Sequence, residues 1–534
     1  MRVEERLTEE GLVGLRAVGH DVVSSRELAS ESFNVDRTLV AAIAIGVATF
    51  VLHFARAGAY GYQRDELYFI SCANHLAWGY VDQPPLIAVI AKLALVLFGD
   101  SLYALRFLPA LAATATVIVT GRLTRRLGGG FGAQVLAMLG IALAPFYLAV
   151  GNLLTMNAFE PLLWTGAAYL FVKADESNDL RLWGALGLVS GLGLINKYSM
   201  FFFLGACVVA IAFSPARRSL VRPGFAFAIA LAAVIVAPTL VWQAQHGWPQ
   251  LEVLRAAAVD KNVVVGPLTF YLQQILMMNP LAAPIWIAGL GSLLLGRSQM
   301  RWYGFAYVLL SIVYLILGAK VYYLAPIYPV LFAAGGVSLE ERFGSVRWAA
   351  FAYPMALLIG GLAIAPEAYP LLPLPTFLRY QSVLDVRSIK MEKHPEGEVP
   401  QHFADMLGWN TLVQTLAGAY ASLTPAEQRD AVILTRDYGQ ASAVDFLGPR
   451  YGLPHAISGH NNYYLYGPGN ASGKLVLAIG FAPAFLHSEF RSVEQVAVYH
   501  DDYVLPDFNN LPIFKCSQPI EPLAAWWPAT KRFI

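Results

Sequence analysis

Residues 38–55 read TLVAAIAIGVATFVLHFA and contain no Asp, Glu, Lys or Arg. A hydrocarbon core about 30 Å thick is crossed by a helix of roughly 17 or more apolar residues. This run therefore predicts a membrane-spanning helix. The residues before it are polar and mixed in charge, and they lack the charged, apolar and cleavage regions of a signal peptide. We expect residues 1–37 to form a cytoplasmic tail that leads into an uncleaved first helix.

Ten further apolar runs follow along the chain. The composition agrees with them, because 57% of the 534 residues are hydrophobic and only 14% are charged, whereas soluble domains carry about 25% charged residues. The sequence therefore predicts a polytopic α-helical membrane protein with about eleven spans. The later runs lie at about 102–121, 131–150, 155–172, 182–196, 199–213, 224–242, 271–295, 302–318, 322–338 and 348–365.

The run Pro84–Phe98 is a twelfth apolar stretch, but it is short and opens with two prolines. Eleven alternating spans place four basic loops on the same side as the N-terminal tail, and basic loops face the cytoplasm. Counting Pro84–Phe98 as a span would divide these loops between two faces, so we predict an interfacial helix there. The four loops are Arg122–Arg126, Arg217–Arg222, Arg297–Arg301 and Arg342–Arg347.

An odd number of spans places the C-terminal region outside the cytoplasm. We therefore predict a transmembrane domain at 38–365, with its first external loop at 56–101, in the inner (plasma) membrane. Residues 366–534 would form an extracytoplasmic domain, and a strand-like run at 431–435 followed by a helical run at 438–447 predicts a small α/β fold. The three cysteines have neither disulfide nor zinc spacing. A net charge of +1 gives no electrostatic case for nucleic acid.

Polar residues outside the basic loops all fall on the predicted external side. An ionisable residue at membrane depth is costly and is a functional candidate by default. Each one also has a structural interpretation: Asp82 could cap a helix, the lysines could extend to the interface, and the tyrosines could belong to an aromatic belt. Their common side and depth favour one site. The residues are Asp65, Glu66, Asp82, Gln83, Asn157, Glu160, Lys197, His246, Lys320, Tyr322 and Tyr323.

This arrangement suits transfer of a sugar from a lipid-linked phosphate. The lipid tail stays in the bilayer, and the departing phosphate needs cations or a metal to hold its charge. Lys197 and Lys320 could supply the cations. The attacking hydroxyl needs a carboxylate to take its proton, and Asp65 is the best placed, with Glu66 to orient it or to bind the acceptor. We find no glycine-rich nucleotide motif.

Four segments resemble the GT-C superfamily of membrane glycosyltransferases. The resemblance is to the family 39-like branch that includes protein O-mannosyltransferases and the aminoarabinose transferase of lipid A. It covers roughly residues 38–365, and two tail segments, residues 437–440 and 457–463, resemble the soluble domain of bacterial members. The four segments are YQRDELY at 62–68, GYVDQPP at 79–85, GLGLINKY at 191–198 and KVYYLAPIYP at 320–329.

The resemblance implies an inverting transferase that uses a polyprenyl-phosphate sugar and an extracytoplasmic glycan, lipid or protein acceptor. Asp65 takes the catalytic position of the family, and Asp82 and His246 match residues that hold a divalent metal ion in the aminoarabinose transferase. Gln83 and Asn157 depart from the pattern, which does not favour lipid A as acceptor. We expect a substrate site lined by Tyr62, Arg64, Tyr68, Gln83, Asn157, Glu160, Lys197, Tyr198, Lys320, Tyr322 and Tyr323.

Three other functions stay open at this point. Within the enzyme class, the acceptor could be cell-wall glycan, with an arabinofuranosyl or mannosyl group transferred. A transporter or flippase for lipid-linked sugars would instead place charged residues near the bilayer midplane and often shows inverted repeats. A non-catalytic assembly protein of the same fold would bind the lipid-linked sugar without turnover.

Overall fold

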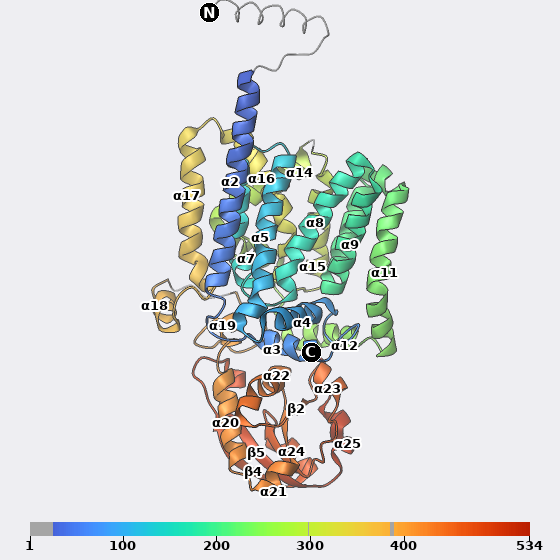
Figure 1. Ribbon diagram of the computed structural model, residues 1–534, viewed down its shortest axis with the longest axis vertical. Helices are drawn as coiled ribbons and strands as arrows, with labels where there is room; N and C mark the ends of the chain where they lie inside the picture. The colour runs from blue at the N-terminus through green and yellow to red at the C-terminus, as the bar shows by residue number, and fades with distance from the viewer. Residues whose placement is uncertain (1–24, 297, 385–388) are drawn as a thin grey trace, which may run out of the picture.

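The computed structural model describes residues 25–296, 298–384 and 389–534. The predicted tail up to residue 24, and Arg297 in one basic loop, lie outside the described residues. The chain forms a bundle of long helices with a smaller C-terminal part at one end (Figure 1). Helix α2 (Ser25–Ala55) begins at the opposite end of the bundle, where α5 (Leu102–Arg126) ends in its basic loop.

Each of the eleven predicted spans coincides with a helix or with a pair of helices, which confirms the predicted fold class. Besides α2 and α5, the bundle contains α6 (Phe131–Ala142), α7 (Pro145–Val150), α8 (Met156–Ser177), α9 (Leu180–Asn196), α10 (Ser199–Ala212), α11 (Pro223–Gln245), α13 (Pro267–Met277), α14 (Ala283–Leu295), α15 (Arg301–Ile316), α16 (Tyr328–Phe343) and α17 (Arg347–Ile364).

Length and hydropathy alone identify four described helices that could cross a membrane, at Arg37–Ala55, Leu102–Arg126, Pro223–Gln245 and Val321–Phe343. The number rises to six if each of two bent helix pairs counts as one span. Five more apolar helices are shorter. The total of eleven spans therefore stays a prediction.

The predicted span 271–295 is wrong as a single straight helix. Helix α13 and the helical segment Pro280–Leu295 meet at 95°. Between them Asn279 adopts a positive φ of 66°, a conformation that ends helices. Pro280 follows and has no backbone N–H to continue the hydrogen-bond ladder. The apolar composition of this stretch concealed the break.

Helices α14 and α16 approach closely where two glycines face each other. A Cβ added at Gly289 would lie 1.9 Å from the carbonyl oxygen of Leu331, and one added at Gly335 would lie 1.8 Å from that of Ile285. Small residues allow helix backbones in a bundle to come this near. The contact fixes α16, and with it the Lys320–Tyr323 segment that precedes α16.

Three helices lie across the end of the bundle, next to the C-terminal part (Figure 1). They are α3 (Arg64–Asn74), α4 (Leu86–Phe98) and α12 (Pro249–Ala256). The position of α4 agrees with the predicted interfacial helix. The N-cap of α4 is Pro85, without a side-chain cap bond, so the interpretation of Asp82 as a helix cap is wrong.

The C-terminal part contains one five-stranded sheet in the order β2-β1-β3-β5-β4. Strand β1 is parallel to β2 and β3, and β5 pairs antiparallel with β3 and β4. The predicted strand and helix are confirmed as β1 and α22. The strands are β1 (Ala431–Thr435), β2 (Ala456–Ser458), β3 (Leu475–Ile479), β4 (Phe490–Tyr499) and β5 (Leu511–Pro519). The helices are α18 (Leu374–Leu384), α19 (Gln401–Ala404), α20 (Trp409–Ala421), α21 (Pro425–Asp430), α22 (Tyr438–Leu447), α23 (Asn462–Tyr466), α24 (Pro483–Glu489) and α25 (Leu523–Trp526).

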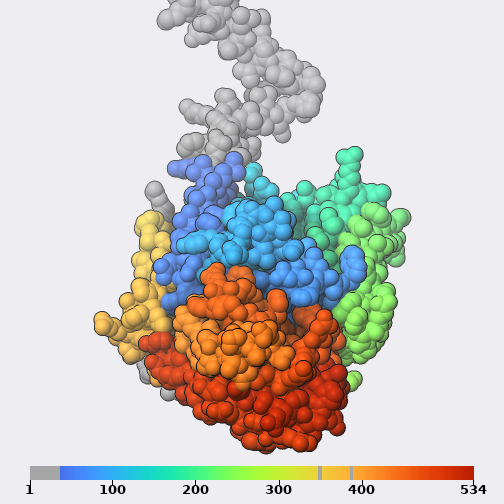
Figure 2. All heavy atoms as spheres, turned by 60° about the horizontal axis from the view of Figure 1, so that its bottom comes forward, coloured from blue at the N-terminus to red at the C-terminus, as the bar shows by residue number. Residues whose placement is uncertain are grey.

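The C-terminal part does not have a core of its own on the bundle side. One hydrophobic cluster joins Leu67, Ile87 and Ala91 of α3 and α4 to Val413 and Ile433 of α20 and β1. Figure 2 shows the orange-to-red C-terminal part packed against the blue segments at the end of the bundle. The boundary predicted at residue 366 therefore divides the sequence but not this core.

Replacing Gly289 by Ala should destabilise the chain, because the new methyl group meets backbone on α16 and overpacking costs about 1–3 kcal/mol. Gly291→Ala is the matched control in the same helix, since a Cβ there meets no described atom within 4 Å. Thermal unfolding of the purified full chain in detergent should show a lower melting temperature for Gly289→Ala and no decrease for Gly291→Ala. Equal melting temperatures would contradict the close contact.

Candidate active site

Helix α3 presents the first predicted catalytic residue. A capping box starts the helix, because the Gln63 side chain accepts a hydrogen bond from the Asp65 backbone and the Glu66 side chain accepts one from the Gln63 backbone. The Asp65 side chain keeps 39% of its surface exposed. Its Oδ1 accepts a hydrogen bond of 2.7 Å from the Tyr438 hydroxyl, and its Oδ2 has no hydrogen-bond partner among the described residues.

Glu66 does not reach a substrate, contrary to the predicted catalytic role. Arg106 donates to both of its oxygens, Nε to Oε1 at 2.9 Å and Nη2 to Oε2 at 2.8 Å. The Leu154 and Gln63 backbone amides donate to the same two oxygens at 2.9 Å. Both side chains of the ion pair are fully buried. Glu66 is therefore a positioning residue that holds the start of α3 against α5 and the loop before α8.

Asp82 lies in a second polar cluster. Its Oδ1 accepts a hydrogen bond from the Tyr68 hydroxyl at 2.9 Å, and its Oδ2 accepts one from the Asn461 amide at 3.0 Å. Burial raises the pKa of Asp82 to about 6. Gln83 is buried and donates to the Cys72 sulfur, so the structure does not place it at the site where a substrate contact was predicted.

Lys197 gathers the residues that were predicted on the fourth and fifth spans. Its ammonium group donates to Asn157 Oδ1 at 2.6 Å and to Glu160 Oε2 at 3.0 Å. It also lies 4.4 Å from the centre of the Tyr323 ring and 5.4 Å from that of the Tyr322 ring, close enough for a cation–π interaction. The structure thus brings these five residues together, as the shared depth in the sequence predicted.

Lys320 also lies near Tyr322, with its ammonium group 6.0 Å from the centre of that ring. It pairs with Glu392, which also lies 3.6 Å from the Lys261 ammonium group and accepts a bond of 2.8 Å from Gln401. Burial alone would raise the pKa of Glu392, but Lys261 and Lys320 hold it well below its usual range. Burial likewise opposes the charge of Lys320, whereas Glu392 raises its pKa.

Asp65 acts on both neighbouring clusters. Its carboxylate adds to the raised pKa of Lys320, after the larger effects of burial and Glu392. It also adds to the raised pKa of Asp82, which is due mainly to burial and is opposed by the Tyr68 hydrogen bond. Charges influence one another in this way only when they are close and partly shielded from water. Asp65, Lys320 and Asp82 therefore belong to one electrostatic site at the end of the bundle.

The remaining predicted residues surround this site at different distances from it. Arg64 is buried, lies 3.8 Å from both Asp65 and Asp405, and contacts the Tyr438 ring. Tyr198 accepts a hydrogen bond from Gln243 at 3.2 Å. Tyr62 is directed away, because its hydroxyl donates to the Asp100 carbonyl at 2.7 Å in an exposed position.

The predicted metal ligands do not fit a metal ion as they stand. Both oxygens of Asp82 accept hydrogen bonds, and His246 is exposed, stacks on Trp242 at 4.0 Å and directs Nδ1 at the Trp242 carbonyl. No group of three or more His, Cys, Asp or Glu that could hold a metal occurs in the part of the chain that the structure describes. Metal dependence stays a prediction that no contact supports, and no step below depends on it.

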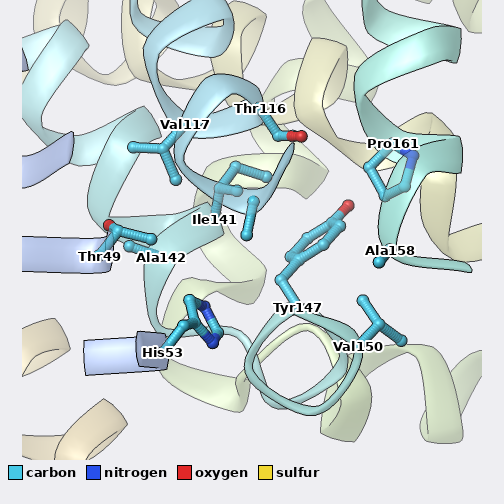
Figure 3. A pocket seen from close by; sticks show the side chains of 11 residues that line it. Thr49, His53, Thr116, Val117, Ile141, Ala142, Tyr147, Val150, Ala158 and Pro161 are labelled. Atoms are coloured by element: carbon cyan, nitrogen blue, oxygen red, sulfur yellow. The ribbon is translucent and has the colours of Figure 1, made fainter. Parts of the chain in front are cut away.

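A small cavity inside the bundle is separate from this site. Figure 3 shows His53 and Tyr147 directed into it, among Thr49, Val117, Ile141 and other mostly apolar residues. It has room for about one water molecule. It is therefore too small for a sugar or a phosphate.

Sequence reasoning missed four residues of the site: Lys261, Glu392, Tyr438 and Asn461. Lys261 stands in a predicted external loop, so its charge and side were a usable signal. The other three lie in the C-terminal part. Glu392 is 72 residues from its partner Lys320, and Asn461 is 379 residues from its partner Asp82. No local pattern marks contacts of this kind.

Two known protein sequences or families are similar to parts of this chain. A model of the dolichyl-phosphate-mannose-protein mannosyltransferase family matches residues 82–242. The lipid A galacturonosyltransferase RgtD of Rhizobium johnstonii is 27% identical over 229 residues, 39% of this chain and 47% of that protein. The chain thus spans about half the length of this curated relative.

Solved structures match over nearly the whole chain. ArnT from Cupriavidus metallidurans, solved bound to undecaprenyl phosphate and in the apo state, covers 89% of this chain with 97% of its own. The TM-score is 0.56 and the identity is 12%, so the likeness shows the fold. The chain is a multi-pass membrane protein with the fold of ArnT, and part of its sequence is similar to glycosyltransferases.

Proposed function

We propose that the protein is an inverting glycosyltransferase that moves a sugar from a polyprenyl-phosphate donor to an extracytoplasmic acceptor. The observation that carries the proposal is that Lys197 and Lys320 lie 5.4 Å and 6.0 Å from the same Tyr322 ring centre, while Asp65 keeps 39% of its side chain exposed. A base and two cations at the end of the bundle are what transfer from a lipid phosphate requires. The predicted location is the outer face of the inner membrane.

The proposed reaction uses Asp65 as general base. Oδ2 of Asp65 takes the proton from the acceptor hydroxyl, whose oxygen forms the new bond to the anomeric carbon. The bond from that carbon to the donor phosphate breaks, and the bonding pair leaves with the phosphate. Attack from the face opposite the phosphate inverts the anomeric carbon. The negative charge that develops on the phosphate is stabilised by the nearby lysines.

We propose that Lys320 and Lys261 bind the donor phosphate and that Glu392 is their counter-ion before the donor arrives. Glu392 is 8% exposed and lies against both ammonium groups, so a phosphate that binds the same cations meets its negative charge. Lys197 is held differently, by Glu160 and Asn157 within the bundle. It would fix the Tyr322–Tyr323 pair and add positive potential beside the phosphate.

Two properties of similar proteins support the choice of substrates. The structure of ArnT contains undecaprenyl phosphate, which favours a polyprenyl-phosphate donor here. RgtD is a galacturonosyltransferase of lipid A, which makes lipid A a candidate acceptor although Gln83 and Asn157 did not favour it. Cell-wall glycan remains the alternative acceptor, with an arabinofuranosyl or mannosyl group.

Replacing Asp65 by Asn should reduce transfer about 10²–10⁴-fold, the usual contribution of a general base. The amide keeps the shape of the side chain but does not accept the proton. The measurement is mass spectrometry of envelope glycans from a deletion strain that expresses each variant at a matched level. Asp100→Asn, an exposed aspartate before α5, is the control and should restore the product fully. Full restoration by Asp65→Asn would refute the assigned role.

Replacing Glu392 by Gln should tighten binding of undecaprenyl phosphate by about tenfold, equivalent to about 1.4 kcal/mol, because the carboxylate no longer competes for Lys320 and Lys261. Binding is measured on the purified full chain in nanodiscs. Glu521→Gln, at an exposed position near α25, should leave the affinity unchanged. Unchanged or weaker binding by Glu392→Gln would show that the phosphate does not use this lysine pair.

A further inference from the structure

The C-terminal part directs the carboxyl ends of two parallel strands at the bundle. Strand β1 is followed by Asp437 and Tyr438, and β2 is followed by His460 and Asn461. The chain runs from β1 to β2 on one side of it, and then from β2 to β3 on the other side of β1. The carboxyl edge at such a reversal is where open α/β sheets bind ligands. Here the edge meets Asp65 and Asp82 of the first external loop.

Tyr438 is tightly held in its contact with Asp65. Its side chain is buried, and its ring packs 4.6 Å from the Tyr68 ring and 4.7 Å from the His460 ring. Asp437 begins α22 with a capping box, and it lies 3.2 Å from His460. The hydroxyl can therefore turn little, and its 2.7 Å hydrogen bond to Oδ1 sets the orientation of the carboxylate.

Asn461 makes the corresponding contact with Asp82. Its backbone has φ 49° and ψ −128°, a conformation that costs free energy for a residue with a side chain. This conformation lets the amide donate to Asp82 Oδ2 at 3.0 Å. The next residue, Asn462, accepts from the Val81 amide at 2.6 Å and donates to the Tyr68 hydroxyl at 3.2 Å. The residue with the strained backbone is therefore the one that contacts Asp82 of the site.

The contacts of Tyr438 and Asn461 are not needed to hold the C-terminal part against the bundle. The hydrophobic cluster shared by α3, α4, α20 and β1 already joins the two parts. Tyr438 and Asn461 instead contact one oxygen of each acidic residue, and they leave Oδ2 of Asp65 open. A hydrogen bond to the ionised form of a carboxylate favours that form, which is the form a general base needs.

We propose that the C-terminal part supplies two positioning residues to the active site, Tyr438 for Asp65 and Asn461 for Asp82. The proposal rests on the proposed function. Tyr438 occupies Oδ1 and directs Oδ2 to the acceptor hydroxyl, so that the proton is transferred to Oδ2. The charged or titratable groups near Asp65 are Arg64 at 3.8 Å, Tyr438, and, at longer range, Lys320, Asp82 and Asp405.

The test uses the full-length chain with Tyr438→Phe, which removes only the hydroxyl. Initial rates of transfer are measured between pH 5 and pH 8 in membranes of the deletion strain, which carry the native donor and acceptor. The rate should fall about tenfold throughout this pH range, because Oδ2 of Asp65 is no longer directed at the acceptor hydroxyl. Binding of undecaprenyl phosphate and the melting temperature should stay at wild-type values.

Matched controls separate positioning from folding. Tyr420→Phe removes a hydroxyl that donates to the Gln428 carbonyl at 3.0 Å within the same part of the chain, and it should leave rate and pH profile unchanged. Asn461→Gly keeps the strained backbone accessible and removes the amide, with its contacts to Asp82 and to the Ile534 backbone, and it should slow transfer at an unchanged melting temperature. Asn178→Gly is its control, because Asn178 has a similar φ of 52° at the exposed end of α8, and it should transfer normally.

The outcomes are distinguishable. If wild-type membranes transfer no sugar, the proposed function fails and the inference fails with it. If wild type transfers and Tyr438→Phe keeps its rate and pH profile, the inference alone is overturned. A loss that is accompanied by a lower melting temperature also overturns it, because it shows a role in folding only.

Discussion

The buried ion pair between Arg106 and Glu66 is the constraint on which the rest of the site depends. Arg106 joins α5 to α3 through Glu66, and its Nη1 and Nη2 also donate to the carbonyl groups of Ala57 and Gly61, respectively. Breaking a buried pair leaves an uncompensated charge, which typically costs about 3–5 kcal/mol. The pair thus fixes the start of α3. It holds Glu66 in the interior and leaves the neighbouring Asp65 side chain exposed to the site.

Compensation of charge is the common feature of the site. Lys197 is neutralised by Glu160, Lys320 and Lys261 by Glu392, and Arg64 by Asp65 and Asp405. An isolated charge at the edge of a membrane has a high free energy, so each of these cations is paired with an anion. In the proposed reaction the phosphate donor exchanges for Glu392, which comes from outside the bundle and is the anion beside two lysines.

The sequence predicted best what depends on composition and periodicity. Apolar length predicted the bundle helices, and shared depth predicted the cluster of Lys197, Asn157 and Glu160. The role of Glu66 was mistaken because its partner Arg106 lies in an apolar span, where a guanidinium group is not expected. The break at Pro280 is a local signal within an apolar run. Tyr438 and Asn461 lie in two segments whose resemblance to bacterial members was noted, but their contacts with Asp65 and Asp82 span long sequence separations, as does that of Glu392, so their place in the site was not predicted.

The hydrophobic cluster that α3 and α4 share with α20 and β1 has a consequence for biosynthesis. Leu67, Ile87 and Ala91 leave the ribosome several hundred residues before Val413 and Ile433, the side chains that cover them. Until those arrive, the ends of α3 and α4 expose an apolar surface to water. The last step in forming this core is therefore docking of the C-terminal part, and not insertion of the helices.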